Sequence, residues 1–199
     1  MTPEQFVALI SFAFVTSVTP GPNNMMLLAS GVNFGLRRTV PHMLGISLGH
    51  ALMVFLVGLG LASVFKAWPL ALTVLKVVSV AYMLWLAWKI AQAGAPGTGK
   101  ASAQPITFLQ AAAFQWVNPK AWAMALGAVA AYVPNPSIQA YALVALVFSA
   151  VNLPSVAVWA GAGQAVRRWL EGPGRLQVFN WTMAVLLVLS LWPVVTMEL

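Results

Sequence analysis

The sequence contains no cysteine and no aspartate, and its only acidic residues are Glu4, Glu171 and Glu198. The absence of cysteine excludes disulfides, thiolate metal sites and thiol redox chemistry. With two histidines and no aspartate, the chain also offers few ligands for a metal ion. We therefore expect no metal and no cofactor.

Charged residues are scarce as well. They make up 7% of the chain, against about 25% in a typical soluble domain, whereas hydrophobic residues make up 61% and the mean hydropathy is +0.86. Apolar runs long enough to cross a bilayer, each of about 20 residues or more, lie approximately at residues 6–34, 40–65, 70–91, 108–133, 140–165 and 176–197. The predicted fold class is an all-α membrane protein with six transmembrane helices.

The basic residues are distributed unevenly. Ten lysines and arginines give a formal net charge of +7. Because they cluster at the ends of apolar runs, we expect contact with membrane lipid and no nucleic-acid partner. They follow the first, third and fifth runs, while the opposite loops contain only Lys66. The positive-inside rule then places both termini outside the cytoplasm. The first run lacks a basic leader, so we expect it to be retained rather than cleaved as a signal peptide.

A stretch of small and polar residues divides the chain into two halves. The sequence AQAGAPGTGKASAQP (Ala91–Pro105) is typical of a flexible linker. We expect a first three-helix repeat over residues 1–92, a cytoplasmic linker over 93–106 and a second three-helix repeat over 107–199. Since each half has an odd number of spans, the second half enters the membrane in the opposite sense, as in inverted repeats.

Each half has proline and asparagine in the middle of its first apolar run, in VTPGPNN (Val18–Asn24) and FQWVNPKAW (Phe114–Trp122). Proline removes a helical donor and clashes with the preceding turn, so we expect transmembrane helices 1 and 4 to be broken at mid-membrane. Unwound backbone is tolerated there only against protein or a water-filled cavity, which predicts that the two breaks face each other. The alternative is a pair of kinks that serve helix packing.

The free N–H groups and carbonyls at such breaks suit the carboxylate and the ammonium of a small zwitterion. The candidate substrate-binding residues are Thr19, Pro20, Gly21, Pro22, Asn23, Gln115, Trp116, Asn118, Pro119 and Lys120. Gly21 gives the chain freedom to unwind. Asn118 and Pro119 suit the cap and the first position of a helix.

Lys120 then lies just inside a helix N-terminus, where a cation is disfavoured, and no acidic residue inside an apolar run can pair with it. We expect it to be neutral before a ligand binds or to find its partner on the ligand; snorkelling to an interface is the alternative. Two residues are candidates for proton coupling. His50 is the best titratable group, although a lone histidine is more often a core residue, and Lys76 is equally suited to snorkelling.

Three segments together resemble the LysE/RhtB family of bacterial amino-acid exporters, namely TPGPNNMML (Thr19–Leu27), SGVNFGLRRTVPHMLGISLGH (Ser30–His50) and FQWVNPKAW. The resemblance covers essentially the whole chain. It implies two inverted three-helix halves in the bacterial cytoplasmic (inner) membrane and amino-acid export driven by the proton gradient. The family's motifs fall on Pro20, Gly21, Pro22 and Asn23, and on Asn118, Pro119 and Lys120. Many members have an aspartate where this chain has His50.

These features predict a secondary transporter that exports amino acids or related small zwitterions, by proton antiport and alternating access around the two breaks. A basic substrate is disfavoured, because the centre offers a lysine and no acid. A passive channel for a small polar solute is the alternative. An enzyme is not expected, because no nucleophile has a base and a third group beside it. Gly45 and Gly49 form a small-residue face suited to close helix contact. Glycine-rich faces also suit a homodimer, although no single interface stands out in the sequence.

Overall fold

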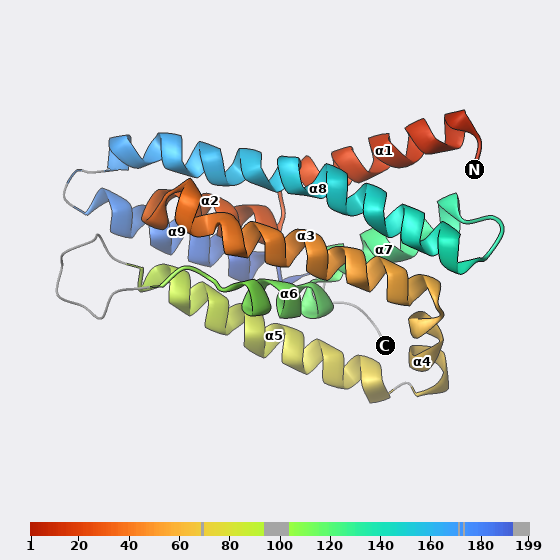
Figure 1. The fold of residues 1–199 in the computed structure, drawn as a ribbon. Helices are drawn as coiled ribbons and strands as arrows, with labels where there is room; N and C mark the ends of the chain where they lie inside the picture. The colour runs from red at the N-terminus through yellow and green to blue at the C-terminus, as the bar shows by residue number, and fades with distance from the viewer. Residues whose placement is uncertain (69, 94–103, 171, 173, 193–199) are drawn as a thin grey trace.

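The structure is a computed structural model of the chain and describes residues 1–68, 70–93, 104–170, 172 and 174–192. Within these residues all regular structure is helical (Figure 1). The helices are α1 (Pro3–Val18), α2 (Pro22–Phe34), α3 (Leu36–Gly58), α4 (Leu61–Ala67), α5 (Leu70–Ala91), α6 (Phe108–Val117), α7 (Pro119–Tyr132), α8 (Ile138–Arg167), the short 3-10 helix η1 (Arg168–Leu170) and α9 (Arg175–Leu189). The all-α prediction is confirmed for this part of the chain.

Several of these helices could cross a membrane by length and composition. Three long apolar segments qualify alone: Leu36–Gly58, Thr73–Ala91 and Ile138–Leu170. A fourth span is formed if α1 and α2 are counted together as one helix bent by 57°. α6, α7 and α9 have only 10, 14 and 15 residues. The described residues therefore contain three or four candidate spans, where the hydropathy pattern predicts six.

Both apolar runs that contain the proline and asparagine motifs are interrupted, as predicted. The first splits into α1 and α2 at Thr19–Gly21, and Pro22 is the first residue of α2. The second splits at Asn118, which ends α6 and begins α7. Proline at the first helical position lacks a donor that a helix start does not need, so each motif ends one helix and starts the next.

The predicted run at residues 40–65 is wrong as a single helix. α3 ends at Gly58, and the chain turns through Gly60, whose φ is 101°, before α4 begins at Leu61. That left-handed conformation favours glycine. Because the residues on both sides of the turn are apolar, the hydropathy pattern does not indicate that the helix ends there.

The predicted linker at 93–106 lies mostly outside the described residues, which resume at Gln104. Its end is well defined, since Thr107 and Gln110 form a capping box at the start of α6. The second half of the chain therefore begins its first helix where the linker was predicted to stop.

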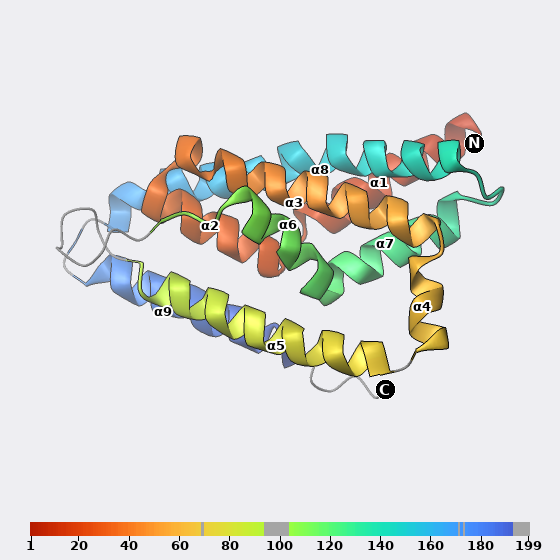
Figure 2. The ribbon, with the colours of Figure 1, turned by 60° about the horizontal axis from the view of Figure 1, so that its bottom comes forward.

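Two long helices organise the bundle. α3 and α8 lie side by side (Figures 1 and 2), and each also contacts several of the shorter helices. α1 and α2 pack mainly on α8, whereas α6 and α7 pack mainly on α3, so each interrupted segment rests on the long helix of the other half. α5 and α9 pair with each other and form a separate layer (Figure 2).

Small residues permit close approach between these helices. A Cβ added at Gly31 of α2 would collide with the backbone of α8, and one added at Gly163 of α8 would collide with the carbonyl of Leu28. On α3, a Cβ at Gly45 or Gly49 would collide with α6. The small-residue face of α3 is thus used for packing inside the chain, and the predicted homodimer cannot use it as its interface.

A polar layer separates two apolar clusters in the interior. On α3, buried His50 lies between Ile46 of one cluster and Met53 of the other. On α8, buried Asn152 lies between the same two clusters. Both interruptions, at Thr19–Gly21 and Asn118, fall at this level, because α1 and α7 contribute to one cluster and α2 and α6 to the other. The polar layer is therefore where the two breaks meet.

Candidate functional site

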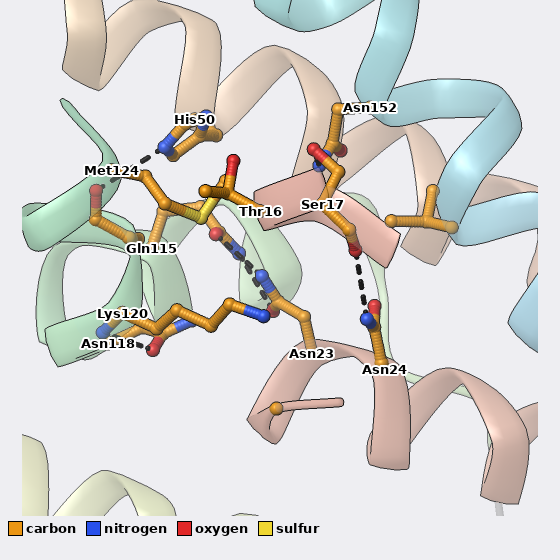
Figure 3. Close-up of a pocket in the computed structure, with 13 residues that line it drawn as sticks. Thr16, Ser17, Asn23, Asn24, His50, Gln115, Asn118, Lys120, Met124 and Asn152 are labelled. Carbon is orange, nitrogen blue, oxygen red and sulfur yellow. Dashed lines mark hydrogen bonds between the residues drawn. The ribbon is translucent and has the colours of Figure 1, made fainter. Parts of the chain in front are cut away.

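A cavity lies between the two breaks (Figure 3). The space between its lining atoms measures ≈ 340 Å³ when the open solvent at its mouth is included. Its lining residues come from α1, α2, α3, α6, α7 and α8 and are Thr16, Ser17, Gly21, Asn23, Asn24, His50, Gln115, Asn118, Lys120, Ala121, Met124, Asn152 and Val156. No acidic side chain is among them.

At the first break, the carbonyls at the end of α1 have lost their helical donors and find others. The side-chain amide of Asn24 donates to the carbonyl oxygens of Ser17 at 2.9 Å and Thr19 at 2.8 Å. The indole Nε1 of Trp159 on α8 donates to the carbonyl of Val18 at 3.0 Å. Buried backbone groups need such partners, and here side chains supply them. The unwound conformation is thus stabilised rather than merely tolerated.

At the second break, Asn118 serves both helices. Its backbone N–H donates to the carbonyl of Gln115 at 3.3 Å, which closes α6 with a tight turn. Its side-chain Oδ1 accepts from the backbone N–H of Lys120 at 3.1 Å, which caps α7. Pro119 is the first residue of α7. The predicted cap and first position are confirmed.

A pair of side-chain amides joins the two breaks. Asn23 Nδ2 donates to Gln115 Oε1 at 2.9 Å, and Gln115 Nε2 donates back to Asn23 Oδ1 at 3.2 Å (Figure 3). Gln115 Nε2 also donates to the Ala111 carbonyl at 2.9 Å, and its side chain is fully buried. The two motifs, far apart in the sequence, therefore meet directly.

Lys120 reaches across the cavity from α7 to the end of α1. Its ammonium donates to the carbonyl of Thr19 at 2.7 Å, to the Thr19 hydroxyl at 3.1 Å and to the carbonyl of Pro20 at 3.4 Å. The C-terminal end of a helix carries partial negative charge, so this is a favourable place for a cation. The sequence predicts that Lys120 is either neutral or paired with a ligand. In the structure its ammonium has partners at the end of α1 instead. The ammonium points to the other break and not to a membrane interface, so the snorkelling alternative is not supported.

His50 lies on the opposite wall of the cavity. Its Nε2 is 3.3 Å from the carbonyl oxygen of Ala121, and its ring centroid is 5.2 Å from that of Phe148. Its Nδ1 has no hydrogen-bond partner among the described residues. One ring nitrogen of this buried histidine is therefore left without a partner in the part of the chain that the structure describes. Lys76, the other proton-coupling candidate, lies on α5 and does not line the cavity.

Other predicted residues contribute backbone or lie outside the cavity. Thr19 and Pro20 provide the carbonyls that hold Lys120, and Pro22 and Pro119 start helices without lining the cavity. Trp116 does not line it either, and its carbonyl accepts from Trp122 Nε1 at 2.8 Å.

Sequence reasoning missed part of the lining. Asn152 of α8 lines the cavity, where it donates to Ser17 Oγ at 3.0 Å and accepts from Ser47 Oγ at 2.8 Å. Asn24, which belongs to the first motif, is a second lining residue outside the predicted set. Both are amides in apolar runs, which is the signal that identifies them.

The cavity offers hydrogen-bonding groups and one cation rather than reactive chemistry. Amides, hydroxyls, an imidazole and an ammonium face it. Among the residues that the structure describes, no cluster of histidine, cysteine, aspartate or glutamate could hold a metal ion. Such a lining suits reversible binding of a small polar molecule.

Comparisons with known proteins agree with this description. The chain matches the LysE type translocator family over residues 14–190. It is 32% identical over 190 residues to a cysteine/O-acetylserine efflux protein from Klebsiella pneumoniae subsp. pneumoniae, covering 94% of this chain and 95% of that protein. It is 33% identical over 192 residues to proteins of the same name from Escherichia coli and Shigella flexneri, covering 94% of this chain and 96% of each.

No solved structure matches the chain. The match to the family covers most of the sequence, including both breaks. The names of the relatives describe efflux of cysteine and O-acetylserine. The protein is accordingly a multi-pass membrane transporter and not an enzyme, and it belongs to the LysE type translocator family.

Proposed function

We propose that this protein is a secondary transporter that exports small neutral amino acids or related zwitterions across the bacterial cytoplasmic membrane. The observation that carries the proposal is the placement of Lys120 beside the carbonyls of Thr19 and Pro20, within one cavity. A zwitterion needs a cation for its carboxylate and acceptors for its ammonium, and both are present here. The named activity of the relatives, efflux of cysteine and O-acetylserine, supports the same substrate class.

We propose further that the chain has six spans arranged as two inverted repeats, over residues 1–92 and 107–199. The packing supports this, because α1 and α2 rest on α8 while α6 and α7 rest on α3, as a twofold relation would require. The polar layer between two apolar clusters supports a position of both breaks at mid-membrane. Alternating access would then move one set of helices against the other around the cavity.

The distribution of basic residues supports an orientation. The ends of α2, α5 and α8 and the starts of α3, α6 and α9 lie at one end of the bundle, and the N-terminus and the α7–α8 connection lie at the other (Figure 1). The first end carries Arg37, Arg38, Lys89, Arg167 and Arg175. We therefore assign that end to the cytoplasm and both termini to the outside.

The lining also favours one substrate class over another. A lysine-like substrate would bring a second positive charge to a cavity without an acidic lining residue. Desolvating that charge without a partner is costly. Neutral zwitterions such as alanine, cysteine or O-acetylserine match the hydrogen-bonding groups and the single cation of the lining. His50 is the proton-coupling group that we propose at this site.

Efflux from proteoliposomes tests the function. The purified full-length protein is reconstituted, and release of labelled alanine, cysteine, O-acetylserine and lysine is followed with and without a pH gradient. We expect saturable release of the neutral amino acids by the wild type. In Lys120→Met we expect the release to be lower by about tenfold or more, because the variant loses the free energy of about one charge-assisted hydrogen bond to the substrate.

Lys89→Met is the matched control, since the Lys89 ammonium lies 5.1 Å from the centroid of the Trp85 ring and outside the cavity lining. We expect it to release the neutral amino acids as the wild type does. The absence of saturable release for every amino acid would reject the proposal. Release that neither saturates nor responds to the pH gradient would indicate a passive channel instead.

A further inference from the structure

We propose that Lys120 is a tethered competitor of the substrate: its ammonium and the substrate's ammonium use the same three acceptors, and export requires them to exchange. This inference rests on the proposed function and adds a mechanism of selection to it. It follows from what Lys120 touches, from the space beside Gly21 and from the charges around the cavity.

The acceptors beside Lys120 match an ammonium group. An ammonium has three N–H donors and no acceptor. The Thr19 carbonyl, the Thr19 hydroxyl and the Pro20 carbonyl lie 2.7, 3.1 and 3.4 Å from Lys120 Nζ, one for each donor. None of them is a carboxylate, so the lysine is held by neutral partners and can be exchanged. An amino acid carries the same donor group.

Gly21 provides the clearance that this contact needs. A Cβ added there would lie 2.9 Å from Lys120 Cδ and 3.2 Å from Lys120 Nζ. The backbone at Gly21 is extended, with φ −177° and ψ 178°, a conformation open to any residue. The sequence suggests that glycine serves to unwind the chain, and Gly21 does lie in the unwound segment between α1 and α2, but its extended backbone does not itself require glycine. The missing side chain matters because it lets the lysine lie across the break.

The exchange explains why both charges of a zwitterion are required. Lys120 is the only cation among the cavity-lining residues that the structure describes. An amine without a carboxylate would displace the lysine and leave it without an acceptor or an anion. A zwitterion displaces the lysine and offers it a carboxylate in return. Two states are compared: Lys120 bound to the acceptors, and the ligand's ammonium bound there with Lys120 displaced. Only contacts that differ between these states favour the ligand. The carboxylate contacts Lys120 in the second state alone, so it decides the exchange.

Binding of ethylammonium, which is alanine without its carboxylate, tests the idea directly. Labelled ethylammonium is measured by equilibrium dialysis on the purified full-length protein in detergent. We expect very weak binding to the wild type and a Kd lower by about tenfold or more in Lys120→Met, because the acceptors become free. Gly21→Ala should also bind better than the wild type, since its methyl group displaces Lys120 without removing the charge. Lys89→Met should bind as weakly as the wild type.

The absence of cysteine permits a rescue experiment. In Lys120→Cys the new thiol is the only one in the chain, and alkylation with bromoethylamine converts it into a side chain that closely resembles lysine. We expect the unmodified variant to bind ethylammonium and the alkylated protein to exclude it again. Restored exclusion would show that the tethered ammonium, and not the fold of the variant, controls the site.

The results separate this inference from the proposed function. If the wild type exports neutral amino acids but Lys120→Met, Gly21→Ala and Lys120→Cys all bind ethylammonium as weakly as the wild type, the inference is wrong and the transport proposal stands. If the wild type transports no amino acid, the proposed function is wrong. Tight ethylammonium binding by the wild type would also overturn the inference, because the lysine would then not compete.

Discussion

Asn23 and Gln115, 92 positions apart, exchange two side-chain hydrogen bonds and thereby join the two interrupted segments. Gln115 is fully buried, so its amide depends on protein partners. The pair lines the same cavity as Lys120 and holds the two breaks in contact. The amide pair therefore links the two halves of the chain at the cavity.

Removing one member of this amide pair should destabilise the protein. We expect Gln115→Leu to lower the free energy of unfolding by about 1–3 kcal/mol, because Asn23 is left with an unsatisfied amide. The double variant with Asn23→Leu should lose less than the sum of the two single losses. Reversible unfolding in mixed micelles measures both; strict additivity would contradict the direct pairing.

A second amide pair offers a control for this experiment. Asn33 and Asn180 join α2 to α9 by two hydrogen bonds of 2.7 and 3.0 Å and do not line the cavity. We expect Asn180→Leu to be destabilising as well, since its amide also donates to the carbonyl of Ala93. Transport by the folded fraction of this variant should stay near the wild-type rate, whereas Gln115→Leu should impair it.

Gly163→Ala should weaken the contact between α2 and α8. A Cβ at this position would overlap the backbone carbonyl of Leu28, which cannot move aside like a flexible side chain. We expect a loss of about 1–3 kcal/mol in the free energy of unfolding. Gly161→Ala on the same helix is the matched control, because nothing lies within 4 Å of its Cβ. It should be neutral or stabilise the helix by up to about 1 kcal/mol; equal losses in both variants would refute the packing explanation.

His50→Gln should remove the dependence of transport on the proton gradient. His50 lines the cavity and has one ring nitrogen without a partner among the described residues. In wild-type proteoliposomes we expect an acidic exterior to accelerate export, and in the variant we expect the same rate with and without the gradient. Lys76→Met should keep the wild-type response, because Lys76 does not line the cavity. An unchanged response in His50→Gln would exclude the histidine from coupling.

The proposed orientation can be tested with single cysteines, since the chain has none of its own. Gln104 precedes α6 and Asn135 lies between α7 and α8, and both side chains are exposed. A membrane-impermeant maleimide added to intact cells should label Asn135→Cys and not Gln104→Cys. After lysis both should react. The reverse pattern in intact cells would mean that the termini face the cytoplasm.

Local chemistry made much of this protein predictable from its sequence. The interruptions at Pro20, Pro22 and Pro119 follow from the missing donor of proline, which acts within one helical turn. The role of Asn118 as a cap is equally local, because its side chain reaches only its own next turn. The apolar runs likewise predict helices whose starts at Leu70 and Phe108 agree with the structure. In these places the residues themselves are sufficient.

Other features depend on helices that are distant in the sequence. The donor for the Val18 carbonyl is Trp159 of α8, and no local pattern indicates that choice. The end of α3 at Gly58 depends on a turn through Gly60 that apolar neighbours conceal. Whether a buried polar group pairs or stays free is decided only when the helices are packed, because its partners come from other elements.

The sequence by itself determined that the chain would be helical and apolar, where its first and fourth runs would break, and which polar residues would stand at those breaks. Only the tertiary structure decided that the ammonium of Lys120 would meet the carbonyls of Thr19 and Pro20 across the cavity. The physical reason is that proline acts on its own turn, whereas an ammonium is satisfied by whichever acceptors the folded chain brings within about 3 Å of it.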